Sequence, residues 1–126
     1  VVAAGVTVFE ACAAHDELLK AGIAICVIDA YSVQPIDAAA LVRAGRKTGR
    51  RIITVEDHYP AGGLGDAVSE AVAEHGITVR RLAVREVPRS GQPRELLDRY
   101  GISASHIAAA VHQQVEAITE ATAGGT

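Results

Sequence analysis

The sequence is poor in aromatic residues and carries no excess of positive charge. It contains one Phe, three Tyr and no Trp, and its formal net charge is −3 with acidic and basic residues interspersed. Proteins usually hold single-stranded nucleic acid through stacking aromatics in a basic groove, and duplex DNA through a basic face. We therefore expect no nucleic-acid partner, and a core that consists mainly of small aliphatic side chains.

Long apolar runs are also absent. No stretch approaches the roughly 20 residues of a membrane-spanning helix, and none resembles a signal peptide, so we expect no membrane partner. The two cysteines, Cys12 and Cys26, form no C-x-x-C pattern, and their apolar surroundings predict buried free thiols. Such thiols fit a reducing, cytoplasmic compartment. Methionine is missing altogether, and because a translation product starts with Met, we expect the chain to be a piece of a longer protein.

Apolar residues recur in short runs that alternate between strand-like and helix-like spacing. The length of 126 residues fits one domain, for which we predict residues 1–122, with 123–126 as a frayed tail. Because strands alternating with helices form right-handed βαβ units, the pattern predicts an α/β fold with a mainly parallel sheet between two layers of helices. The predicted strands are Val1–Ala4, Ile23–Ala30, Ile52–Val55 and Ile77–Val84, and the predicted helices are residues 7–21, 37–48, 66–75 and 94–100 and a last one starting at Ser103 or Ser105.

Several local signals refine these elements. Thr7 and Glu10 have the spacing of a capping box, and Asp37 is a suitable N-cap for the second helix. The continuous apolar run of Ile23–Ala30 predicts a strand covered on both faces. The apolar phase of the last strand shifts at Arg80–Arg81, which indicates either a bulge or an edge strand. Helical spacing predicts a buried stripe on the first helix formed by Val8, Ala11, Cys12, His15, Leu18 and Leu19.

A glycine cluster precedes the third predicted helix. Gly62, Gly63 and Gly65 permit a positive φ and close approach of another group to the backbone. A helix N-terminus presents free N–H groups and a partial positive charge, and it can hold a phosphate or carboxylate. A loop that only turns the chain and packs against a neighbour is the alternative. The dinucleotide fingerprint fails, because Val68 stands where its third glycine belongs.

Four polar residues follow the third predicted strand. Glu56, Asp57, His58 and Tyr59 lie at its carboxyl end, the edge at which open α/β sheets gather their sites. Adjacent strand residues point to opposite sides, so Asp57 and His58 are poorly placed to share one proton. The alternative interpretation is a carboxylate that caps loop amides, with a His at an interface. With the three glycines, these residues form the candidate anion-binding or interface loop.

At this point the residues resemble a known family, the C-terminal domain of transketolase. The Glu-Asp-His-Tyr sequence with Gly-Gly-x-Gly, followed later by Val-Pro-Arg-Ser-Gly, is the most specific part of the resemblance. It covers nearly the whole chain. The matching segments are Ala4–Glu10, Pro35–Asp37, Thr54–Tyr59, Gly62–Gly65, Val87–Gly91, Glu95–Leu97 and Tyr100–Ile102.

The resemblance implies a three-layer α/β/α domain with a five-stranded mixed sheet, one strand antiparallel. It also implies a homodimeric parent of the pentose phosphate pathway that transfers two-carbon ketol units between sugar phosphates. That parent uses thiamine diphosphate with Mg²⁺ or Ca²⁺, held by the N-terminal and middle domains. No catalytic, cofactor or metal residue of the family falls in this domain. Two hypotheses follow: a non-catalytic domain for structure and dimer assembly, or an autonomous small-anion-binding or regulatory module that uses the glycine loop.

Overall fold

The computed structural model describes residues 1–30, 36–57, 63–83 and 101–124, and four parallel strands form the sheet in this part of the chain. The strand order is β2-β1-β3-β4, so the first strand inserts between the second and the third. The strands are β1 (Val2–Ala3), β2 (Ile28–Asp29), β3 (Arg51–Glu56) and β4 (Thr78–Ala83).

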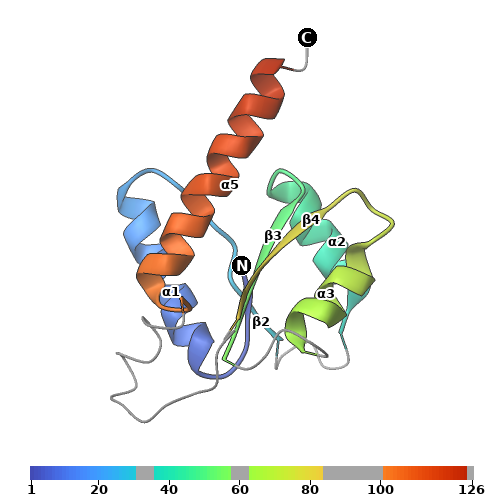
Figure 1. The fold of residues 1–126 in the computed structure, drawn as a ribbon, viewed down its shortest axis with the longest axis horizontal. Coiled ribbons are helices and arrows are strands. Elements are labelled where there is room, and N and C mark those ends of the chain that lie inside the picture. Colours follow the sequence, from blue (N-terminus) through green and yellow to red (C-terminus); the bar gives the residue numbers. More distant parts are fainter. Residues whose placement is uncertain (31–35, 58–62, 84–100, 125–126) are drawn as a thin grey trace.

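Helices cover both faces of this sheet, as Figure 1 shows. The first and last helices pack together on one face, and the other two pack together on the opposite face. The helices are α1 (Val6–Lys20), α2 (Ala38–Lys47), α3 (Leu64–Val72) and α5 (Ala104–Gly124). The predicted α/β architecture of three layers is therefore confirmed. The implied antiparallel strand is not among the described residues, and the predicted helix 94–100 lies outside them.

The sheet separates two aliphatic cores. One core lies between the sheet and the α1–α5 pair and contains Leu18, Val55 and Ile107. The other lies between the sheet and the α2–α3 pair and contains Leu41 and Val68. Every residue of β3 from Ile52 to Glu56 is buried, which places the carboxyl end of β3 inside the molecule.

The first helix begins differently from the prediction. Gly5, with φ of +64°, is its N-cap residue, so the predicted capping box is wrong. Thr7 is buried, and its hydroxyl donates to the carbonyl oxygens of Ala4 and Val55, each at 2.8 Å. The carboxylate of Glu10 instead accepts a hydrogen bond from the amide of Ala104 at 3.1 Å. Both side chains therefore serve tertiary contacts, which local spacing does not reveal.

The buried face of α1 is also shifted from the predicted stripe. Thr7, Ala11, Ala14 and Leu18 are buried, whereas Leu19 is 54 % exposed. Cys12 and Cys26 are both exposed thiols, so the prediction that they are buried is wrong. Apolar neighbours in sequence misled it, because two small alanines, Ala11 and Ala14, belong to the buried face of α1 and Cys12 lies outside that face.

The remaining strand and helix predictions have mixed outcomes. Asp37 is confirmed as the N-cap of α2, since its Oδ1 accepts a hydrogen bond from the amide of Ala40 at 3.1 Å. Within the strand predicted at Ile23–Ala30, strand β2 (Ile28–Asp29) is the part that pairs with β1. The six residues of β4 pair with β3 without interruption, so β4 has no bulge and lies at the edge of the described sheet. Helix α3 starts at Leu64, two residues before the predicted start.

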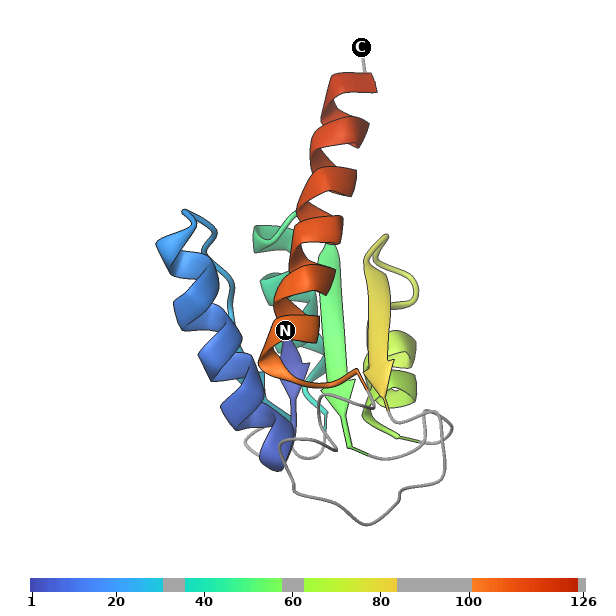
Figure 2. The same ribbon diagram turned by 60° about the vertical axis from the view of Figure 1, so that its left-hand side comes forward.

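The last helix projects beyond the sheet. Figure 2 shows that the C-terminal half of α5 extends past the amino ends of the strands. Helix α5 runs to Gly124, and the predicted domain limit at residue 122 stays a prediction. None of the described helices combines the length and the apolarity that crossing a bilayer requires.

Candidate functional site

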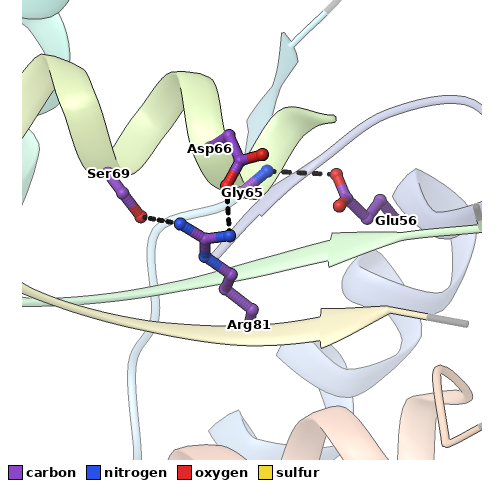
Figure 3. Close-up of polar contacts among 5 residues, drawn as sticks. All are labelled: Glu56, Gly65, Asp66, Ser69 and Arg81. Carbon is purple, nitrogen blue, oxygen red and sulfur yellow. Dashed lines mark hydrogen bonds and ion pairs between the residues drawn. The ribbon is translucent and has the colours of Figure 1, made fainter. Parts of the chain in front are cut away.

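The carboxyl end of β3 meets the first turn of α3 through Glu56. This side chain is 1 % exposed, and its Oε2 accepts a hydrogen bond from the amide of Gly65 at 3.0 Å (Figure 3). The amide belongs to the N-terminal turn of α3, where the free N–H groups and the helix dipole favour negative charge. The chain's own carboxylate therefore occupies a position at which an external anion would bind this turn.

Arg81 on β4 fixes the same turn from the side. Its guanidinium forms an ion pair with Asp66 and donates a second hydrogen bond to the hydroxyl of Ser69 at 3.0 Å (Figure 3). The two side chains of the ion pair are only partly exposed, 31 % for Arg81 and 43 % for Asp66. Strand β4 and helix α3 are thus tied together next to the Glu56 contact.

The side chain of Arg81 approaches the backbone of Gly65 closely. A Cβ atom at this position would lie 2.8 Å from Cδ of Arg81, closer than side-chain atoms come without displacement. The backbone of Gly63 is extended, with φ of −98°, and neither glycine has a positive φ. The freedom for a positive φ is therefore not used at Gly63 or Gly65, whereas the Arg81 side chain does approach the backbone of Gly65 closely.

The structure brings together part of the predicted loop. Glu56, Gly63 and Gly65 lie at one junction, and Asp57 follows β3 as an exposed residue. His58, Tyr59 and Gly62 lie outside the described residues. In the sequence, Arg81 was identified only as part of the shift in the apolar pattern of the last strand. In the structure, the aliphatic part of its side chain lies over Gly65.

Comparison with known proteins decides the family. The family model described as "Transketolase, C-terminal domain" matches residues 1–107. The chain belongs to the transketolase C-terminal domain family. Transketolase-like protein 2 of Mus musculus is 54 % identical over 116 residues, which cover 91 % of this chain and 18 % of that protein. Transketolase of Homo sapiens is 52 % identical over 112 residues, which cover 88 % of this chain and 18 % of that protein.

A solved structure agrees with the sequence comparison. The chain described as "Split gene transketolase, inactive beta4 tetramer" superimposes with a TM-score of 0.81 at 39 % identity. The match covers 89 % of this transketolase domain and 37 % of that chain. The domain spans about a fifth of the length of the curated relatives it matches.

The cofactor that the transketolase family implies can be tested against these residues. A diphosphate at the glycine loop would need the N–H groups of the first turn of α3, but the amide of Gly65 already binds the buried Glu56 carboxylate. In the described part of the chain, no group of three or more His, Cys, Asp or Glu residues is arranged to hold a metal ion. The described residues of the loop therefore do not fit thiamine diphosphate and its metal.

An exposed aromatic residue was missed by the sequence analysis. Phe9, the only Phe of the chain, is 77 % exposed on α1, and Val6 one turn earlier is 41 % exposed. Both lie in the first turns of α1, close to the carboxyl edge of the sheet, because Thr7 between them contacts the carbonyl of Val55 at 2.8 Å. The i, i+4 and i, i+7 spacing of the buried residues around Ala11 leaves position 9 facing outward, which was the available signal.

Proposed function

We propose that this chain is the C-terminal domain of a longer transketolase, which transfers two-carbon ketol units between sugar phosphates. The family match over residues 1–107 and the small share of each relative that the chain covers support this proposal. In the proposal, thiamine diphosphate and Mg²⁺ or Ca²⁺ are bound by the N-terminal and middle domains of the parent enzyme, which acts as a homodimer.

Within that enzyme, the proposed role of this domain is structural rather than catalytic. The polar residues at the carboxyl edge of β3 and the start of α3 are engaged with one another: Glu56 binds Gly65, and Arg81 binds Asp66 and Ser69. Such contacts hold a strand and a helix together. The solved relative is described as an inactive beta4 tetramer of a split-gene transketolase, and a non-catalytic role for this domain is consistent with that description.

The observation that carries the assembly role is the exposure of Phe9. A large aromatic side chain that is 77 % exposed is costly to leave in water, and aromatic residues are enriched at the centres of protein interfaces. Val6 extends this apolar surface toward the carboxyl edge of the sheet. We define Val6 and Phe9 as the α1 patch and propose that it packs against another domain or subunit of the parent.

The anion-binding alternative receives less support. The amide of Gly65 would have to exchange the Glu56 carboxylate for an external anion, and Glu56 would then remain as a buried negative charge beside it. Two like charges at one helix terminus repel each other strongly in a buried environment. The contact at Gly65 therefore favours the structural role.

Replacing the C-terminal domain of Mus musculus transketolase with this chain provides the test. We expect the chimera to form an active dimer, and Phe9→Ser to raise the dimer dissociation constant about 10-fold, the effect of a moderate interface anchor. Leu19→Ser is the matched control, because Leu19 is 54 % exposed near the other end of α1. Sedimentation measures the dissociation constant. An inactive chimera contradicts the family role, and equal constants for both variants contradict the α1 patch.

A further inference from the structure

Basic residues gather where α2 ends and β3 begins. Between residues 38 and 55 the chain has no Asp or Glu, yet this stretch holds five of its 12 Lys and Arg residues. Because β3 begins at Arg51, they lie at the amino ends of the strands, the edge opposite to the contact between Glu56 and Gly65. The five residues are Arg43, Arg46, Lys47, Arg50 and Arg51.

Three of these arginines border an open hollow of about 400 Å³. Helix α5 forms part of its wall, since its C-terminal half extends past the amino ends of the strands (Figure 2). Ile118 of α5 packs onto the turn between α2 and β3, because a Cβ atom at Gly49 would lie 2.6 Å from its Cδ1. The hollow thus combines basic and apolar sides. Its lining is Arg46, Gly49, Arg50, Arg51, Ile118 and Ala121.

The dipole of α2 accounts for only part of this positive charge. A helix C-terminus carries about half a negative elementary charge, whereas Arg46 and Lys47 in the last turn of α2 each carry a full positive charge. Arg50 and Arg51 lie beyond the helix and add to this excess. In the part of the chain that the structure describes, none of the three arginines of the hollow forms an ion pair with a carboxylate. Their charge is therefore available to an external anion.

The guanidinium groups also keep most of their hydrogen-bond donors. Nη1 of Arg50 donates to the carbonyl of His75, and Nη1 of Arg51 donates to Oε1 of Gln114, each at 3.0 Å. A guanidinium has five N–H donors, so one such contact fixes the side chain and leaves the other donors for a ligand. Arg46 is exposed, and among the described residues it has no hydrogen-bond partner.

The backbone that carries these arginines is held in an unfavourable conformation. Within residues 1–30, 36–57, 63–83 and 101–124, Arg50 is the only non-glycine residue with a positive φ, +61°, and it follows Gly49 with φ of +69°. The carbonyl of Gly45 fixes this turn, since it accepts from the amides of Thr48 at 3.1 Å and Arg50 at 2.8 Å. Strained backbone of this kind is frequent at ligand sites, where it fixes the direction of side chains.

We propose that this hollow binds a small phosphorylated molecule with at least two negative charges. Arginine suits phosphate because the guanidinium fork matches two phosphate oxygens, and one phosphate group carries about 1.5–2 negative charges at pH 7. The volume falls in the range of about 300–1,000 Å³ that is usual for small-molecule sites. Ile118 and Ala121 offer an apolar surface to the carbon skeleton of such a molecule. The site goes beyond the proposed function and does not rest on it.

Nuclear magnetic resonance of the backbone amides provides the test, with sodium pyrophosphate as the probe. We expect saturable shifts at residues 46–51 and 118–121, which surround the hollow. Residues 63–66 at the start of α3 should not shift, and they report on any binding at the glycine loop instead. Sodium sulfate at the same ionic strength is the control for general charge screening, and it should give no saturable shift.

Arg46→Gln and Arg43→Gln form a matched pair of variants. Both remove one positive charge from an exposed position of α2, but only Arg46 borders the hollow. We expect Arg46→Gln to raise the Kd for pyrophosphate about 10-fold, the value of one charge-assisted hydrogen bond, and Arg43→Gln to change it less than about 2-fold. Equal increases, saturation by sulfate, or shifts centred on residues 63–66 would overturn the proposal. None of these measurements needs activity or dimer formation, so their outcome is separate from that of the chimera.

Discussion

The carboxylate of Glu56 and the amide of Gly65 form a buried hydrogen bond of 3.0 Å between residues nine positions apart in sequence. The contact joins the end of the central strand β3 to the first turn of α3, and Arg81 ties the same turn to β4 through Asp66. The sequence of this loop is typical of an anion site, but the amide of Gly65 already donates to a carboxylate of the same chain. The stability of the domain should therefore depend on Glu56, Gly65 and Arg81.

Removing the Glu56 side chain should destabilise the domain. We expect Glu56→Ala to lower the free energy of unfolding by about 2–3 kcal/mol, because a charge-assisted hydrogen bond is lost and the amide of Gly65 stays buried. Glu56→Gln is the control, since its amide oxygen can accept the same hydrogen bond, and it should cost clearly less. Urea unfolding measures both, and equal losses would show that this contact does not stabilise α3.

A side chain at Gly65 should displace Arg81. We expect Gly65→Val to lower the free energy of unfolding by about 1–3 kcal/mol, because its Cβ would lie 2.8 Å from Cδ of Arg81. The same change in an Arg81→Ala background should cost less, since the obstructing stem is gone. A double-mutant cycle from urea midpoints gives the coupling. Additive losses would place the strain elsewhere.

The isolated chain should neither bind the cofactor nor transfer ketol groups. In the proposed function the cofactor site belongs to the preceding domains, and here the amide of Gly65 binds Glu56. Calorimetric titration of the folded chain with thiamine diphosphate and Mg²⁺ is expected to show no saturable heat. The active chimera described above serves as the positive control. Micromolar binding by the isolated chain would contradict the prediction.

Stability of the chain with a free amino terminus at Val1 should depend on pH. Desolvation lowers the pKa of this amino group from 8.0 to about 6 in the folded chain, so the unfolded chain binds its proton more readily between these values. The free energy of unfolding should therefore fall as the pH drops from 8 to 6, by on the order of 1–2 kcal/mol. Acetylation of Val1 should remove this part of the dependence. Identical pH profiles for the free and acetylated chains would rule it out.

Local sequence signals predicted where helices and strands occur better than they predicted which residues these elements contact. Asp37 begins α2 as predicted, because an N-cap acts within its own helical turn. Thr7 and Glu10 have capping-box spacing but bind Val55 and Ala104 instead, since packing of α1 against β3 and α5 brings those partners within reach. Helical or strand spacing alone carries no information about partners that lie 48 or 94 residues away.

The sequence by itself determined the alternation of strands and helices, the parallel three-layer architecture and the family, because hydrophobic periodicity and short motifs are local properties. Only the tertiary structure showed that the amide of Gly65 is bound by the carboxylate of Glu56. Glu56 was expected at a strand end and Gly65 at a helix start, but their hydrogen bond depends on how β3 and α3 pack. The role of Arg81 likewise required the register between β3 and β4, which places its stem over Gly65. Tertiary packing sets these distances, and local sequence patterns carry no information about them.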